Sequence, residues 1–129
     1  MARDNVTVLL PTQDATQSIE VGAITKKAVT VANGIAVQKA LKNKNNSLQI
    51  FIENTGSAST CTIKAGNHYP NKILGDLPVA VGASAITAVI LDDISRFENK
   101  DGSVNLDFAT GFTGNVWAVA KRAGIKPVV

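Results

Sequence analysis

The sequence predicts an all-β fold: an antiparallel β-sandwich, jelly-roll-like, preceded by an extended N-terminal arm. Short apolar runs with alternating character recur from about residue 26, and turn-forming residues separate them. The length of 129 residues fits one domain. Hydrophobic residues make up 45% of the chain and aromatic residues 5%, so we expect a core of Val, Ile, Leu and Ala side chains.

Residues 1–25 are expected to form the arm. A short apolar run ends at Pro11 and is followed by the polar stretch TQDATQS, so no core-facing periodicity persists. Leaving the apolar side chains of this run in water would be costly, because burial of each is favourable. We therefore expect the arm to contact a neighbouring subunit through four side chains: Val6, Val8, Leu9 and Leu10.

Residues 26–129 are expected to form the sandwich domain. Asp101-Gly102 and Asn33-Gly34 each suit a tight hairpin, and Gly111 and Gly114 bracket a further turn. The run IAVQKALKNKNN would also suit a helix by propensity, and both interpretations remain open there. Strands are expected near residues 27–32, 35–40, 48–54, 59–65, 77–81, 85–91, 95–98, 104–109 and 115–122.

Alternation along these strands predicts which side chains face the core. Phe51 falls on the outer face of its strand, where either the arm or another subunit would cover it. A second core layer is an equal alternative for this residue. In the last strand both faces look half-buried. The predicted inward side chains are Leu48, Ile50, Ile52, Cys61, Ile63, Ile86, Ala88, Ile90, Val104, Leu106 and Phe108.

The low charge favours a protein partner, whereas the run of lysines is most simply explained as solvated side chains at strand ends and in loops. Charged residues make up 18% of the chain, which is low for an isolated monomer and suggests burial of surface in an assembly. The net charge is +3, and residues 21–52 hold lysines without an acidic residue. The stretch lacks the arginines and exposed aromatics that nucleic-acid binding favours, so we expect no direct nucleic-acid partner. The lysines are Lys26, Lys27, Lys39, Lys42 and Lys44.

We find no constellation of residues that predicts an enzyme, a metal site or a cofactor. The single cysteine, Cys61, excludes an internal disulfide and is expected to be a small buried residue. The single histidine, His68, lies in the turn-rich stretch GNHYPNK and is expected to be a loop residue. Asp92-Asp93 lacks EF-hand spacing and is typical of turns. The N-terminus shows no signal peptide or membrane span, so we expect synthesis in a reducing compartment.

Residues 46–122 hold an ordered series of short β elements. It begins with IFIENTGSASTCTIKAG, a strand, polar turn and strand. It continues through DLPVAVGASAITAVILDDISRFENKDGSVNLDF and ends in a final strand from Val116 to Ala120. This series resembles the head decoration (capsid cement) proteins of tailed bacteriophages. It is an order of short β elements rather than a set of invariant residues.

This resemblance implies a structural virion protein, made in the host cytoplasm and bound to the capsid exterior. It implies the major capsid protein as partner, self-association as a homotrimer, and an arm that reaches a neighbouring subunit. Bridging of capsomers would stabilise the shell against internal DNA pressure. On this view the five lysines and Phe51 are candidates for contact with the capsid.

Two other functions remain open. Another virion subunit, in the tail, the connector or the minor capsid proteins, would share most of these features. A carbohydrate-binding jelly roll is the other, because Tyr and Trp stack on sugars. Clustering of Trp117, Tyr69 and Phe112 around one exposed groove would favour the sugar binder.

Overall fold

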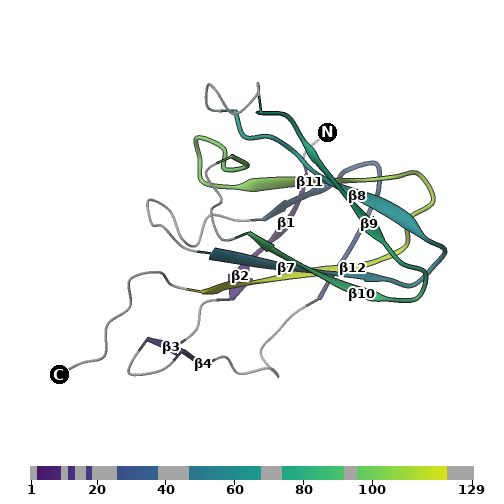
Figure 1. The fold of residues 1–129 in the computed structure, drawn as a ribbon, viewed down its shortest axis with the longest axis horizontal. Helices are drawn as coiled ribbons and strands as arrows, with labels where there is room; N and C mark the ends of the chain where they lie inside the picture. The colour runs from purple at the N-terminus through teal and green to yellow at the C-terminus, as the bar shows by residue number, and fades with distance from the viewer. Residues whose placement is uncertain are drawn as a thin grey trace.

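The computed structural model describes residues 3–9, 12–13, 17–18, 26–37, 47–67, 74–91 and 96–121. Two sheets pack face to face, which confirms the predicted β-sandwich (Figure 1). The sheet that we call the β11 sheet has the strand order β1 (Asp4–Val6), β6 (Ile35–Val37), β11 (Val104–Phe108), β8 (Ser59–Ile63) and β9 (Leu77–Val81). The β7 sheet runs β10 (Ile86–Leu91), β7 (Ser47–Asn54), β12 (Gly114–Lys121) and β2 (Val8–Leu9), with β5 (Lys27–Ala28) also paired to β12.

The core lies between the sheets and is aliphatic, as the composition predicts. Every second residue of β7, β8 and β11 points into it, because side chains alternate along a strand. Ile50, Ile63 and Leu106 are fully buried, so the inward faces predicted for these strands are confirmed. Phe108 and Phe112 close one end of the core with ring centroids 4.6 Å apart.

Most tight turns carry the chain from one sheet to the other. The segments 55–58, 82–85 and 109–113 each join a strand of one sheet to a strand of the other. Asn54 holds two of these turns together, since its buried side-chain amide donates to the carbonyl oxygens of Ser57 (2.8 Å) and Gly82 (3.0 Å). The hairpin predicted at Asn33-Gly34 is wrong, because this turn also crosses between the sheets. β5 pairs with β12 in the β7 sheet, whereas β6 pairs with β1 and β11 in the β11 sheet.

The turn predicted at Asp101-Gly102 is present, in a different form from a two-residue hairpin. Gly102 has a positive φ of 88° and Asp101 does not, and the amide of Gly102 donates to the carbonyl of Asn99 at 2.8 Å. This is a type I turn closed by a left-handed glycine, a common three-residue hairpin connection. The strand expected at 95–98 is reduced to an isolated bridge between Glu98 and Val104, and residues 92–95 lie outside the described part of the chain.

Residues 3–9 of the N-terminal arm belong to the sandwich of their own chain. β1 pairs in parallel with β6, and β2 pairs in parallel with β12, so this short segment contributes a strand to each sheet. A second pair of short strands, β3 (Thr12–Gln13) and β4 (Gln17–Ser18), forms a two-stranded antiparallel ribbon. Where the sequence predicts a helix or a strand at residues 35–40, residues 35–37 are strand β6 and the rest lie outside the described residues.

The facing predicted for β10 is wrong. Ile86, Ala88 and Ile90 point outward, with Ile86 57% and Ile90 61% exposed. Their neighbours Val89 and Leu91 face the core instead. The error has a physical cause: both faces of ITAVIL are apolar, so alternation alone does not fix its register against β7.

Candidate protein-binding face

The outer face of the β7 sheet carries a continuous group of apolar side chains. The strand register places Ala88 of β10 beside Phe51 of β7, and Phe51 beside Trp117 of β12. Ile86 and Ile90 flank this row at the β10 edge. Exposed aliphatic side chains next to aromatic ones are typical of protein contact surfaces. We call this group the apolar face: Phe51, Ile86, Ala88, Ile90 and Trp117.

The two aromatic rings at the centre of the apolar face lie parallel. Phe51 and Trp117 stack with centroids 5.5 Å apart and planes inclined by 5°. The ammonium of Lys26 lies 5.1 Å from the centroid of the Trp117 ring, within the range of a cation–π contact. Both rings are half-buried, so part of the stack remains accessible to a partner.

The charges bordering the apolar face are mutually compensated. Lys26 and Glu53 form an ion pair of 3.4 Å, and the side-chain amide of Asn115 donates to Glu53 at 2.9 Å. The hydrogen bond from Asn115 is the main cause that holds the pKa of Glu53 below its ordinary value, and Lys26 adds to it. Glu53 therefore stays ionised and paired, and it leaves the apolar row beside it uninterrupted.

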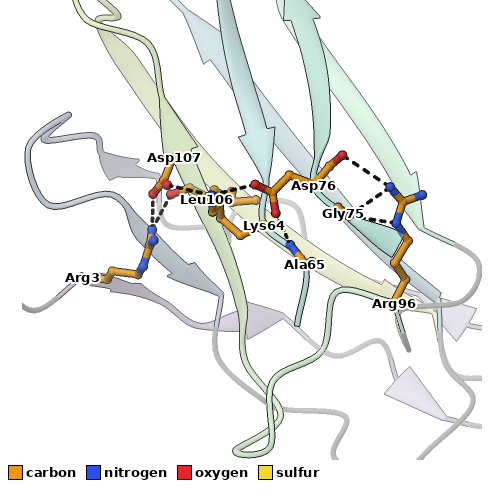
Figure 2. Close-up of polar contacts among 8 residues, drawn as sticks. All are labelled: Arg3, Lys64, Ala65, Gly75, Asp76, Arg96, Leu106 and Asp107. Atoms are coloured by element: carbon orange, nitrogen blue, oxygen red, sulfur yellow. Dashed lines mark hydrogen bonds and ion pairs between the residues drawn. The ribbon is translucent and has the colours of Figure 1, made fainter. Parts of the chain in front are cut away.

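The outer face of the β11 sheet has the opposite character (Figure 2). Arg3 forms an ion pair with Asp107 and donates to the carbonyl of Leu106 at 2.9 Å. Lys64 lies between two carboxylates, 2.7 Å from Asp76 and 3.9 Å from Asp107. These groups form one ion-pair network across the strands of the sheet, with partly exposed side chains. The two faces of the sandwich therefore differ: one is charged and paired, and the other is apolar.

Asp76 connects this network to the loop before β9. Besides Lys64, its carboxylate accepts a hydrogen bond of 2.7 Å from the amide of Ala65. The Lys64 hydrogen bond is the first cause, and the Ala65 bond the second, that lower the pKa of Asp76. The same contact raises the pKa of Lys64. Arg96 extends the loop contacts by donating to the carbonyl oxygens of Leu74 (3.2 Å) and Gly75 (3.0 Å).

A polar depression of about 550 Å³ lies beside this network, next to the 99–103 turn. Its asparagine side chains mainly bond the protein itself: Asn99 accepts from the amide of Asn67 at 3.0 Å, and Asn67 accepts from the amide of Lys100 at 2.7 Å. The depression holds both cationic and anionic side chains, and this mixture specifies no ligand. Its lining comprises Arg3, Asn5, Ala36, Asn67, Asn99, Lys100, Asp101, Ser103 and Asn105.

The residues that the sequence predicts as contacts fall in different places. Phe51 and Lys26 lie on or beside the apolar face, and Lys27 is exposed on β5. Val6 and Val8, expected at a subunit contact, are instead buried in the core of their own chain. The backbone of Leu9 pairs with Val119 in β2. Leu10, Lys39, Lys42 and Lys44 lie outside the described residues.

Two of the aromatic residues weighed for sugar binding, Phe112 and Trp117, do not share a groove. Phe112 is buried against Phe108, whereas Trp117 lies on the outer face of the β7 sheet. Tyr69 and His68 lie outside the described residues. Trp117 and Phe112 therefore do not form a shared aromatic surface on which a sugar could stack.

Sequence reasoning missed the exposed side chains of β10. The pairing of β10 with β7 is a tertiary property, and the strand itself is apolar on both faces. No local signal indicates the facing, because Thr87, the one polar residue of the strand, would favour its own face as the solvent side. In the structure Thr87 is half-buried on the inner side, and the isoleucines beside it are exposed.

Among the residues that the structure describes, no group of three or more His, Cys, Asp or Glu side chains is placed to hold a metal ion. In the same part of the chain, no helix has the length and hydrophobicity needed to cross a membrane. Comparisons of the chain with known protein families, with curated proteins and with solved structures found no match.

Proposed function

We propose that this chain is a structural virion protein that binds the exterior of a phage capsid and stabilises the shell by bridging capsomers. The observation that carries the proposal is the apolar face of the β7 sheet, where Ile86 and Ile90 are more than half exposed beside the Phe51–Trp117 stack. A surface of this kind suits a protein partner better than a small molecule, because it exposes apolar side chains without convergent polar groups.

The difference between the two faces would determine how the domain is oriented on the capsid. The apolar face would be buried against the capsid, and the ion-paired face of the β11 sheet would remain in solvent. Burial of the apolar side chains stabilises such a contact by about 25 cal/mol for each Å² of apolar surface removed from water. Many copies on a symmetric shell would turn a modest affinity for each site into firm overall attachment.

The lysines supply a second, electrostatic contribution to this proposal. Lys27 is exposed, and Lys26 lies at the border of the apolar face. An acidic capsid surface would be attracted to Lys27 and would compete with Glu53 for Lys26, and salt would weaken that attraction. Replacement of all five lysines, Lys26, Lys27, Lys39, Lys42 and Lys44, with Gln should weaken attachment and flatten its salt dependence. Unchanged occupancy would show that the lysines do not contribute to the contact with the capsid.

The copy number of the chain in purified virions tests the proposal directly. Quantitative mass spectrometry should give a simple symmetric ratio to the major shell protein. A handful of copies would indicate a tail or connector subunit instead, and absence from virions would overturn the virion role.

A pair of variants then tests which face binds. F51S alters the centre of the apolar face, and T62A alters an outward residue on β8 in the β11 sheet. We expect F51S to lower occupancy on shells and T62A to leave it unchanged. Equal occupancy of the two variants would show that the apolar face is not the binding surface.

A further inference from the structure

The open edge of β10 is a second feature that the proposed function does not use. β10 is the first strand of the β7 sheet, and among the described residues it pairs with β7 alone. Its sequence, ITAVIL, contains no charge, no proline and no glycine. Natural edge strands usually carry such residues, because unpaired N–H and C=O groups otherwise recruit another strand.

The hydrogen-bonding direction of β10 follows from its register. The amide of Asn54 donates to the carbonyl of Ala85 at 2.9 Å, so the backbone groups of Ala85 point toward β7. Along an antiparallel strand, successive residues direct their backbone N–H and C=O groups alternately to one side of the strand and to the other. Thr87, Val89 and Leu91 therefore also bond β7, and the N–H and C=O groups of alternate residues point to the open edge. Those residues are Ile86, Ala88 and Ile90.

The corresponding edge of the other sheet is blocked. β9 is an edge strand that pairs with β8, and the amide of Ala109 donates to Thr60 on the far side of β8. The same alternation then directs the backbone of Pro78 and Ala80 to the open edge of β9. Proline has no N–H, so Pro78 removes a donor from that edge. Of these two edge strands, β9 is thus protected and, among the described residues, β10 is not.

We infer that β10 pairs with β10 of a second copy of this chain, antiparallel about a two-fold axis at Ala88. In this register Ile86 of one copy faces Ile90 of the other, and Ala88 faces Ala88. Each of these pairs exchanges two backbone hydrogen bonds, because all three residues direct their backbone groups outward. The strand is self-complementary: isoleucine meets isoleucine, and no charge opposes another.

This pairing joins two β7 sheets into one and doubles the apolar face. A two-fold contact cannot by itself close the trimer that the phage resemblance implies. The inference does not depend on capsid binding, and it is tested on the purified chain in solution. Failure of one proposal therefore leaves the other standing.

The test is the mass of the purified protein by light scattering and sedimentation equilibrium across a wide range of concentration. We expect twice the 13.5 kDa of the chain at high concentration. A88P removes an N–H that β10 does not use within its own sheet, so the fold should persist while self-association weakens roughly tenfold or more. A80P is the matched control, since it removes an edge N–H from β9, and it should leave the dimer unchanged.

Two double variants test the register. I86K/I90K places lysine opposite lysine across the two-fold axis and should yield monomers, whereas I86K/I90E places lysine opposite glutamate and should retain the dimer. Circular dichroism and urea unfolding establish that each variant is folded. A monomeric wild type, a trimer that A88P does not affect, equal effects of A88P and A80P, or equal loss in both double variants would overturn the inference.

Discussion

Phe51 and Trp117 lie directly opposite each other on β7 and β12, and their rings stack with centroids 5.5 Å apart. A cross-strand aromatic pair of this kind usually stabilises a sheet by more than its buried area alone. Here the pair stands on the outer face, so it also fixes the shape of the surface that a partner would meet. Trp117 is the single tryptophan of the chain.

A double-mutant cycle on this pair should show coupling. We expect F51A and W117A each to lower the free energy of unfolding, and the double variant to lose less than the sum by about 0.5–1.5 kcal/mol. Far-UV circular dichroism in urea measures all four proteins without relying on the tryptophan. Strict additivity of the two single effects would show that the stack contributes nothing beyond burial.

Ile50 and Ile90 give a matched test of the facing of β10. Ile50 is fully buried, so I50A should lower the free energy of unfolding by about 2–5 kcal/mol. Ile90 is 61% exposed, so I90A should change it by about 0.5 kcal/mol or less. Urea unfolding measures both, in the A88P background to exclude any contribution from self-association. A large loss in I90A would instead indicate that Ile90 faces the core.

Ile50 and Ile90 also show which parts of the fold can be predicted from the sequence. β7 alternates between apolar and polar residues, so its inward face, including Ile50, follows from the pattern. β10 is apolar on both sides, and its facing depends on the contacts with β7. The sandwich and the positions of its longer strands were predictable because turn residues punctuate the chain, whereas sheet membership was not. A turn such as Asn33-Gly34 has the same composition whether it joins paired strands or crosses between sheets.

The candidate site was predictable only in part, for a related reason. Phe51 is a lone aromatic on a polar strand face, and this contrast makes it visible in the sequence. Its neighbours on the apolar face come from β10 and β12, which are distant in the chain and aligned by register. Burial of Val6 and Val8 in their own core likewise depends on parallel pairing between distant segments, which no local pattern encodes.

The Lys64–Asp76 pair should give the protein an acid-sensitive increment of stability. The folded state lowers the pKa of Asp76, so this increment is present above the unfolded pKa and is lost as pH falls through the folded value. D76N should therefore flatten the decline in stability between neutral and acidic pH. Exposed pairs of this type contribute about 0.2–1 kcal/mol and weaken with salt. Urea unfolding at a series of pH values measures this; identical pH profiles for D76N and wild type would contradict the assignment.

Cys61 should be unreactive in the folded protein. It is fully buried in β8, and burial raises the pKa of its thiol to about 12. The neutral thiol is a poor nucleophile, so labelling by a thiol reagent at pH 8 should require unfolding and should accelerate sharply in urea. Because the folded pKa is raised, stability should fall as pH rises above the ordinary value of 9.0. C61A should lose this alkaline decline; rapid labelling of the folded wild type would show that the strand opens.

Val6 tests whether the N-terminal segment belongs to its own chain. Its side chain is buried between the sheets, so V6A should lower the free energy of unfolding by about 1.5 kcal/mol or more. Thr7, its exposed neighbour, is the control, and T7A should change stability by about 0.5 kcal/mol or less. Both are measured in the A88P background, so that pairing through β10 does not contribute. If the loss in free energy of unfolding does not depend on protein concentration, β1 is docked within its own chain. A midpoint of urea unfolding that rises with protein concentration would indicate that the segment is exchanged between subunits.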